Sequence, residues 1–188
     1  MRLLLASKSP RRRQLLAELG FPIGIVSVDV DEHIDAPLPA DQVAEHLACR
    51  KSEAFPSDRL SEGDVLVTAD TVVVLDGKVL GKPASRTEAV AMLHGLSGRS
   101  HEVYTGVCLR TNRIRRSFTE QTTVHFSTLT DAEIDYYVDH YRPFDKAGAY
   151  GIQEWIGMVG ISRIEGCFYN VMGLPVARLY AALKALTA

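Results

Sequence analysis

Apolar residues along this chain form short runs that alternate with helical stripes. The runs 3–6, 23–28 and 65–69 are short and mostly apolar, which predicts strands, and the last is apolar enough to be buried on both faces. Segments 10–19 and 40–55 instead space their apolar residues as one face of a helix does. The first third of the chain therefore predicts a β–α–β–α–β order.

A β-hairpin is expected after the third predicted strand. Asp76 and Gly77 separate the apolar runs 72–75 and 78–80, and this pair tolerates the positive φ values of a type I′ turn. A hairpin pairs its strands antiparallel, whereas β–α–β units pair them parallel. The sequence thus predicts the α/β class with a mixed sheet flanked by helices.

Capping boxes mark two helices in the rest of the chain. Ser85 and Thr130 each precede a glutamate by three residues, and each is expected to open a helix. Two long β-rich segments, 100–111 and 114–128, lie between these helices. The glycine-rich region 148–173 is expected to hold two short strands before a final helix.

The composition fits one globular domain spanning residues 1–188. Its apolar fraction of 46% supplies a sizeable core, and no linker or repeat divides it. A formal net charge of −2 argues against a nucleic-acid polymer as the main partner, whereas a small phosphorylated ligand needs only a local basic patch. Three widely spaced cysteines and the lack of an apolar stretch near ~20 residues predict a reduced cytoplasmic protein that does not enter a membrane.

The segment 7–13 carries the strongest chemical signal. Ser9 is a good N-cap, and Pro10 suits the first helical position. Three arginines follow in the first turn, although each cation at this positively polarised end costs about 0.3–1 kcal/mol. The arrangement favours a bound anion, phosphate above all. A solvated basic face after an ordinary N-cap is the alternative.

Carboxylates follow two of the predicted strands. Asp70 comes directly after strand 65–69, and Asp29, Asp31 and Glu32 follow the second strand. Acids at the carboxyl ends of neighbouring strands project into an open cleft, and Mg²⁺ or Mn²⁺ would relieve their mutual repulsion. Taken singly, Asp70 is also compatible with a role in capping a turn, and each of the other acids is also compatible with a solvated loop charge.

Two further segments suit a nucleotide. Lys82 follows the hairpin and can reach a phosphate as a point charge, although the spacing of 77–82 excludes a Walker A loop. The glycine-rich segment 145–153 ends at Gln153, whose amide offers both a donor and an acceptor to a base edge. Lys51, on the second predicted helix, and Gln153 are each also compatible with a surface position.

Taken in order, these motifs resemble those of the Maf family of nucleoside triphosphate pyrophosphatases along nearly the whole chain. The matching segments are 5–12, 69–71, 81–83, 96–101, 145–153 and 171–175. The resemblance implies an α/β fold with a mixed, elongated central sheet flanked by helices and a cleft between two lobes, similar to inosine triphosphate pyrophosphatases. It also implies metal-dependent hydrolysis of a nucleoside triphosphate to the monophosphate and pyrophosphate, by a cytoplasmic enzyme that is often a homodimer.

The resemblance also assigns roles to single residues. It implies that Asp70 is the proton acceptor and that Glu32 and Asp70 are the carboxylates on the side of the metal. The contacts that it implies with the phosphates are Arg12, Lys51 and Lys82, with Ser7 and Ser9 lining the turn.

The substrate base is addressed by a third set of positions. Arg11, Thr71 and Gln153 stand where the subfamilies differ, and these residue types resemble the branch that acts on dTTP and UTP. The sister branch, which acts on 7-methyl-GTP, has Trp in place of the first arginine. Glu154-Trp155 and Ile161-Ser162 depart from many relatives. Two alternatives therefore stay open: the same chemistry on 7-methyl-GTP or modified nucleotides, and a nucleotide-binding regulator of cell division.

Overall fold

The computed structural model describes residues 1–31, 33 and 38–186 of the chain. The chain divides into two compact units. The first comprises Met1–Asp70, Thr105–Glu120 and Gly173–Ala188, and the second comprises Thr71–Tyr104 and Gln121–Met172. None of the helices in these described ranges has the length and apolar character needed to cross a membrane.

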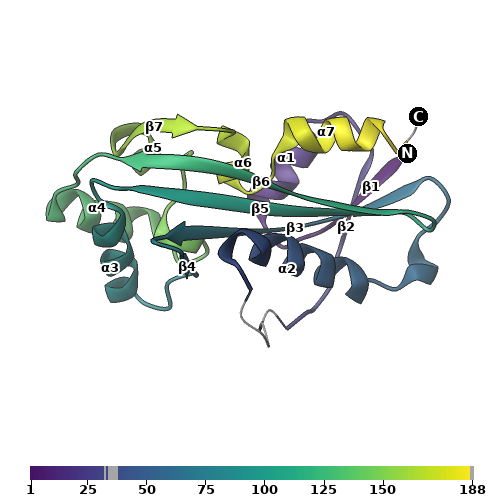
Figure 1. The fold of residues 1–188 in the computed structure, drawn as a ribbon, viewed down its shortest axis with the longest axis horizontal. Coiled ribbons are helices and arrows are strands. Elements are labelled where there is room, and N and C mark those ends of the chain that lie inside the picture. The colour runs from purple at the N-terminus through teal and green to yellow at the C-terminus, as the bar shows by residue number, and fades with distance from the viewer. Residues whose placement is uncertain (32, 34–37, 187–188) are drawn as a thin grey trace. The chain divides into compact units, whose positions relative to one another are not determined.

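Among the described residues, seven strands form a sheet of mixed direction (Figure 1). The strands are β1 (Arg2–Ala6), β2 (Ile23–Val26), β3 (Asp64–Leu75), β4 (Lys78–Leu80), β5 (Ser100–Arg110), β6 (Arg115–Phe126) and β7 (Ile161–Glu165). Their order is β2-β1-β3-β5-β6-β7, with β4 paired to β3. Strand β1 is parallel to β2 and β3, whereas β4 and β7 are antiparallel to their neighbours. The predicted mixed α/β class is confirmed.

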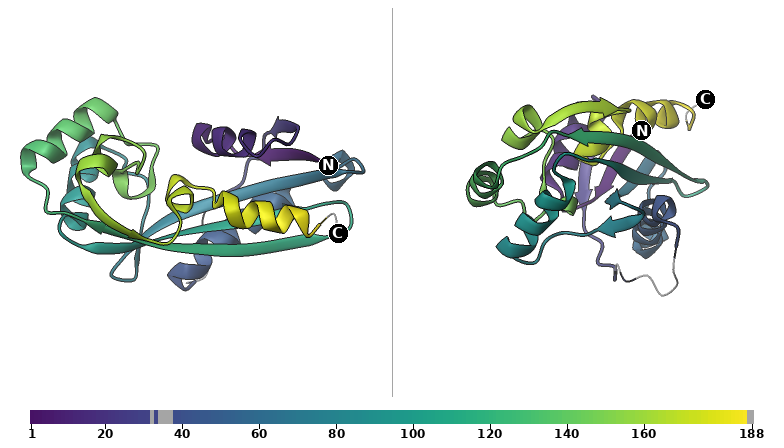
Figure 2. Two further views of the ribbon diagram at one scale, coloured as in Figure 1. Left: turned by 90° about the horizontal axis from the view of Figure 1, so that it is seen from above. Right: turned by 60° about the vertical axis from the view of Figure 1, so that its left-hand side comes forward.

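The first unit packs helices on both faces of its strands. Figures 1 and 2 show α2 on one face and α1 and α7 on the other. The helices are α1 (Pro10–Ala17), α2 (Ala40–Ala54) and α7 (Val176–Lys184), with a short 3-10 helix, η1, at Ser57–Arg59. One apolar cluster of this unit contains Leu4, Ala6, Phe55, Leu60 and Leu66. Strand β1 is therefore buried, as its run of leucines predicted.

The backbone of helix α2 packs closely against the backbone of β5. A Cβ atom at Gly106 of β5 would stand 2.2 Å from the backbone nitrogen of Glu45, so only glycine allows this approach. The hydroxyl of Thr68 on β3 donates a hydrogen bond of 2.7 Å to the carbonyl of Ala48. These two contacts fix the position of α2, the helix that carries Lys51.

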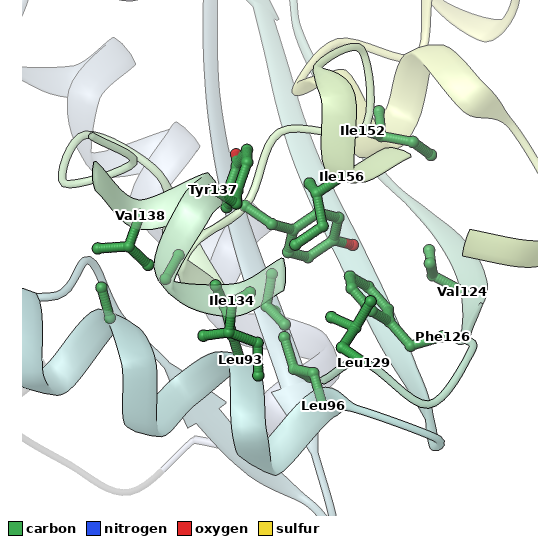
Figure 3. Packing of buried hydrophobic residues seen from close by; sticks show 14 of the residues in the cluster. Leu93, Leu96, Val124, Phe126, Leu129, Ile134, Tyr137, Val138, Ile152 and Ile156 are labelled. Carbon is green, nitrogen blue, oxygen red and sulfur yellow. The ribbon is translucent and has the colours of Figure 1, made fainter. Parts of the chain in front are cut away.

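The second unit has its own core. Its helices are α3 (Arg86–Leu96), α4 (Asp131–Tyr141), α5 (Trp155–Val159) and α6 (Phe168–Met172), with a 3-10 helix, η2, at Ala147–Ala149. Figure 3 shows Leu93 and Leu96 of α3 converging with Ile134 of α4 and Ile156 of α5. All four side chains are fully buried, so these three helices share one apolar cluster.

The predicted hairpin turn and one of the two predicted capping boxes are confirmed, and the other box is only half formed. Asp76 and Gly77 have φ values of 51° and 74°, as the hairpin between β3 and β4 requires. Thr130 forms both halves of the capping box that opens α4. Ser85 caps α3 by accepting the N–H of Glu88, but the Glu88 carboxylate takes the N–H of Ala84 instead of that of Ser85.

Two expectations were wrong. The sequence predicted that a strand ends before Asp70, whereas β3 continues through it to Leu75. Aspartate is depleted in strands, but this one lies half-buried with an ion-pair partner, which offsets the unfavourable local preference. The region 148–173 holds one strand and two helices, not two strands. Helices α5 and α6 have five residues each, which is too short for a periodic pattern.

His101 is a buried titratable group in the core of the second unit. Its side chain is fully buried, packs against Phe126 and shares a hydrogen bond of 2.8 Å with the Tyr150 hydroxyl. Burial, with a smaller contribution from nearby His125, lowers the pKa of His101 to about 4. The imidazole is therefore neutral in the folded protein at neutral pH.

The free energy of unfolding is expected to fall between pH 6.5 and 4 because of His101. In this pH window His101 is protonated in the unfolded chain but stays neutral in the folded chain. The free energy of unfolding is therefore lower by roughly 3 kcal/mol at pH 4. Urea unfolding at several pH values should show a weaker pH dependence for His101→Gln than for the wild type. His46→Gln, at an exposed position on α2, is the control and should keep the wild-type dependence. Equal slopes for wild type and His101→Gln would contradict this prediction.

Candidate active site

The turn between β1 and α1 is organised by its own serines. The Ser7 hydroxyl accepts the N–H of Ser9 at 3.2 Å, and the Ser9 hydroxyl accepts the N–H of Arg12 at 3.4 Å. The first turn of α1 contains no acidic residue, so its charges are those of the arginines alone. Arg11 and Arg12 are half-buried, whereas Arg13 is exposed. The turn thus presents two partly desolvated cations at a helix N-terminus.

The guanidinium of Arg12 joins this turn to two other segments of the first unit. It donates hydrogen bonds of 2.9 Å to the carbonyl of Ala69 and 2.8 Å to the carbonyl of Gly173. Ala69 immediately precedes Asp70 on β3. The arginine-rich turn and the Asp70 segment therefore lie side by side.

Asp70 is paired with a lysine from α2. Its carboxylate lies 2.5 Å from the Lys51 ammonium, and the two side chains are 14% and 15% exposed. Partial burial makes the attraction between these charges stronger than at an open surface. The first unit thus brings together Asp70, Lys51 and Arg12, and the next residue along β3, Thr71, is half-buried at the start of the second unit.

The remaining candidates lie in the second unit. Lys82 is exposed two residues after the end of β4. Its turn is tied to the glycine-rich segment because the carbonyl of Gly81 accepts the N–H of Gly148 at 3.0 Å. Gly148 has a φ of 68°, and a Cβ there would stand 3.0 Å from the side chain of Val73. Gln153 is exposed. Lys82 and Gln153 are therefore both accessible, on segments that the backbone holds in place.

The donors for a metal ion are few among the described residues. Glu32 lies outside the described residues. Asp29 and Asp31 are exposed, and no group of three or more His, Cys, Asp or Glu that could hold a metal occurs in the described ranges. Mg²⁺ usually keeps several waters and takes only one or two carboxylates besides the phosphates of its substrate. Asp70 fits that demand as a carboxylate donor.

The sequence pattern did not single out two polar residues close to Gln153. Lys146 is almost fully buried and forms an ion pair with Glu154, and the hydroxyl of buried Tyr137 donates to the same carboxylate. A lysine inside a glycine-rich apolar run was the one sequence signal of this arrangement. Tyr137 gave no signal, because a tyrosine on the apolar face of a helix is ordinary core.

Fold and side chains together define an α/β protein in which a lysine pairs with a carboxylate on a sheet strand and an arginine binds the carbonyl of the preceding residue. Such a class of protein is suited to phosphate-containing ligands. The family model of Maf-like protein matches residues 2–186, and the chain belongs to the Maf family.

Curated relatives match over nearly their whole length. The chain is 51% identical to the dTTP/UTP pyrophosphatase of Bacteroides thetaiotaomicron, covering 98% of this chain and 95% of the relative. It is 49% identical to the dTTP/UTP pyrophosphatase of Porphyromonas gingivalis, covering 97% and 93%. Among solved structures, the Staphylococcus aureus Ham1 protein matches with a TM-score of 0.53 over 100% of both chains at 13% identity. That likeness concerns the fold alone.

Proposed function

We propose that this chain is a nucleoside triphosphate pyrophosphatase that hydrolyses dTTP and UTP to the monophosphate and pyrophosphate. The observation that carries the proposal is the Asp70–Lys51 pair with the Arg12 guanidinium on the adjacent carbonyl. Hydrolysis of a phosphoanhydride needs a base for the attacking water and positive charge for the leaving group, and these side chains supply both. The names of the curated relatives supply the substrate.

Each member of the site has a distinct task in this proposal. Asp70 accepts a proton from the attacking water, and Lys51 holds its carboxylate in one orientation. Arg12, Lys51 and Lys82 balance the charge of the leaving pyrophosphate. Ser7 and Ser9 shape the turn that presents Arg12.

A divalent cation, Mg²⁺ or Mn²⁺, belongs to the proposal as the cofactor. Asp70 would hold it, together with Glu32, which the family resemblance implies. When bound, the cation supplies neutralisation of the triphosphate charge. The protein's own cations then need to balance only the charge that develops on the departing pyrophosphate.

Arg11, Thr71 and Gln153 are proposed to select the base. A glutamine amide offers a donor and an acceptor side by side, which matches the N3–H and O4 edge of thymine and uracil. Thymine and uracil share this edge, and this explains how one site accepts both dTTP and UTP.

A substrate panel tests the function directly. Purified protein with Mg²⁺ or Mn²⁺ is expected to release pyrophosphate from dTTP and UTP faster than from dCTP, dATP, GTP or 7-methyl-GTP. A chelator should abolish release, and added Mg²⁺ or Mn²⁺ should restore it. Absence of pyrophosphate from both dTTP and UTP would refute the proposal, and a preference for 7-methyl-GTP or a modified pyrimidine would move the substrate to that nucleotide.

Location and assembly complete the proposal. The three cysteines are free thiols, which agrees with a reducing compartment, and we place the enzyme in the cytoplasm, where nucleoside triphosphates are available. Its partner is the small nucleotide, not a nucleic-acid polymer. The homodimer implied by the family is tested by light scattering on purified protein.

A further inference from the structure

The hydroxyl of Tyr137 holds two ends of the segment that carries Gln153. It accepts the N–H of Gly151 at 2.9 Å and donates to the carboxylate of Glu154. The Tyr137 ring is fully buried in the core of the second unit. Burial first, and the Glu154 carboxylate second, raise the pKa of this hydroxyl far above its ordinary value, so that it keeps its proton. At neutral pH the hydroxyl therefore has the proton that it donates to Glu154.

A buried cation holds Glu154 from the other side. The Lys146 ammonium lies 3.1 Å from the Glu154 carboxylate and 2.7 Å from that of Asp145. The Lys146 side chain is 9% exposed and that of Glu154 is 19% exposed, so water competes little for this pair. Glu154 is thus fixed by a charge and by a hydroxyl from separate elements, which leaves its side chain one orientation.

Gln153 lies in the chain between Gly151 and Glu154, which are both hydrogen-bonded to Tyr137. A Cβ atom at Gly151 would lie 2.9 Å from both the Gln153 amide nitrogen and the Glu154 carboxyl carbon, so both side chains fold back over Gly151. Gln153 itself is exposed, and exposed glutamines ordinarily sample several rotamers. Here Gly151 and Glu154, on either side of Gln153, are both hydrogen-bonded to buried Tyr137. The Glu154 carboxylate also shares the space above Gly151 with the Gln153 amide, which limits the room in which that amide can turn.

We propose that Glu154 is a positioning residue that, with Tyr137 and Lys146, sets the orientation of the Gln153 amide and thereby the choice between thymine or uracil and cytosine. The inference rests on the proposed function, in which Gln153 contacts the base. Thymine and uracil present an acceptor at position 4, whereas cytosine presents an amino donor there. An amide held in one orientation matches the first pattern and opposes the second, whereas an amide free to rotate by 180° fits both.

The test compares Glu154→Ala, Glu154→Gln and Tyr137→Phe with the wild type, using dTTP, UTP and dCTP as substrates. In these variants the Gln153 amide is free to rotate, and the ratio of kcat/KM for dTTP to that for dCTP is expected to fall roughly tenfold. The fall should come from a higher KM for dTTP and a higher kcat/KM for dCTP. The kcat for dTTP should stay within about twofold of the wild-type value. Glu154→Gln should lie between wild type and Glu154→Ala, because its amide oxygen still accepts from Tyr137. The double variant Tyr137→Phe/Glu154→Ala should lose no more of the base ratio than the more affected single variant, because both changes break the same hydrogen bond.

Two matched controls separate this role from general loss of structure. Tyr136→Phe removes a hydroxyl from the exposed neighbour on the same helix, and Glu165→Gln removes a half-exposed carboxylate that pairs with His125 and Arg163. Both should keep the wild-type base ratio. Thermal unfolding identifies any variant that fails to fold. If one variant fails to fold, the positioning role is tested by the remaining variants of Glu154 and Tyr137.

The outcomes are distinct. A wild type that hydrolyses neither dTTP nor UTP refutes the proposed function, and this inference falls with it. If the wild type prefers dTTP over dCTP and Gln153→Ala removes that preference while Glu154→Ala and Tyr137→Phe retain it, Gln153 contacts the base without Glu154, and the inference alone is overturned. Equal losses of kcat on all three substrates with an unchanged base ratio would also overturn it, because they indicate a structural role.

Discussion

Replacing Asp70 by asparagine is expected to lower the turnover of dTTP and UTP by roughly 10²-fold or more. The amide has nearly the same shape as the carboxylate but does not accept a proton from water at neutral pH. The change also removes the carboxylate charge that pairs with the half-buried Lys51 ammonium. Pyrophosphate release under saturating substrate measures the effect on kcat, and calorimetric titration of dTTP into the variant shows whether the nucleotide still binds.

Asp58→Asn is the matched control for this prediction. It removes the same charge from an exposed position in η1 of the same unit and should keep turnover within about twofold. Near-normal turnover of Asp70→Asn would refute the role of Asp70 as the base. The same variant addresses the alternative of a cell-division regulator, because a cellular effect that survives without turnover would assign the function to nucleotide binding.

Replacing Gly106 by alanine is expected to destabilise the protein by about 3 kcal/mol or more. The added methyl group would stand 2.2–2.3 Å from backbone atoms of Ala44 and Glu45 in α2. Backbone atoms in a helix do not move aside singly, so α2 as a whole must shift away from β5. Because α2 carries Lys51, the surviving folded fraction should also lose activity. Urea unfolding followed by circular dichroism measures the stability change.

Gly95→Ala is the matched control, and it is expected to raise the free energy of unfolding, not to lower it. Gly95 lies inside α3, and a Cβ there would make an ordinary contact of 3.7 Å with Leu75. Alanine in a helix interior is favoured over glycine by about 0.5–1 kcal/mol. If Gly106→Ala were as stable as the wild type, the close approach of α2 to β5 would be wrong, and with it the placement of Lys51 beside Asp70.

The candidate site was predicted from the sequence in parts. The sequence marked Asp70, Arg12 and Lys51 singly, each with an ordinary surface or capping role as the alternative. It also predicted that the strand stops at Asp70, because local preference disfavours aspartate inside a strand. The structure instead continues β3 and offsets the charge with Lys51, 19 residues earlier in the chain. The few residues on either side of Asp70 in the sequence contain no information about a partner that lies on another element.

The sequence by itself determined the elements whose stabilising contacts are local. The hairpin at Asp76-Gly77 and the capping box at Thr130 involve atoms at most a few residues apart, so the residue types alone decide them. Only the tertiary structure decided which distant groups meet. Arg12 reaches a carbonyl 57 residues away, and Tyr137 reaches Glu154 across 17 residues. Such contacts follow from strand order and helix packing, in which the energy of many apolar contacts selects the arrangement and the polar side chains follow.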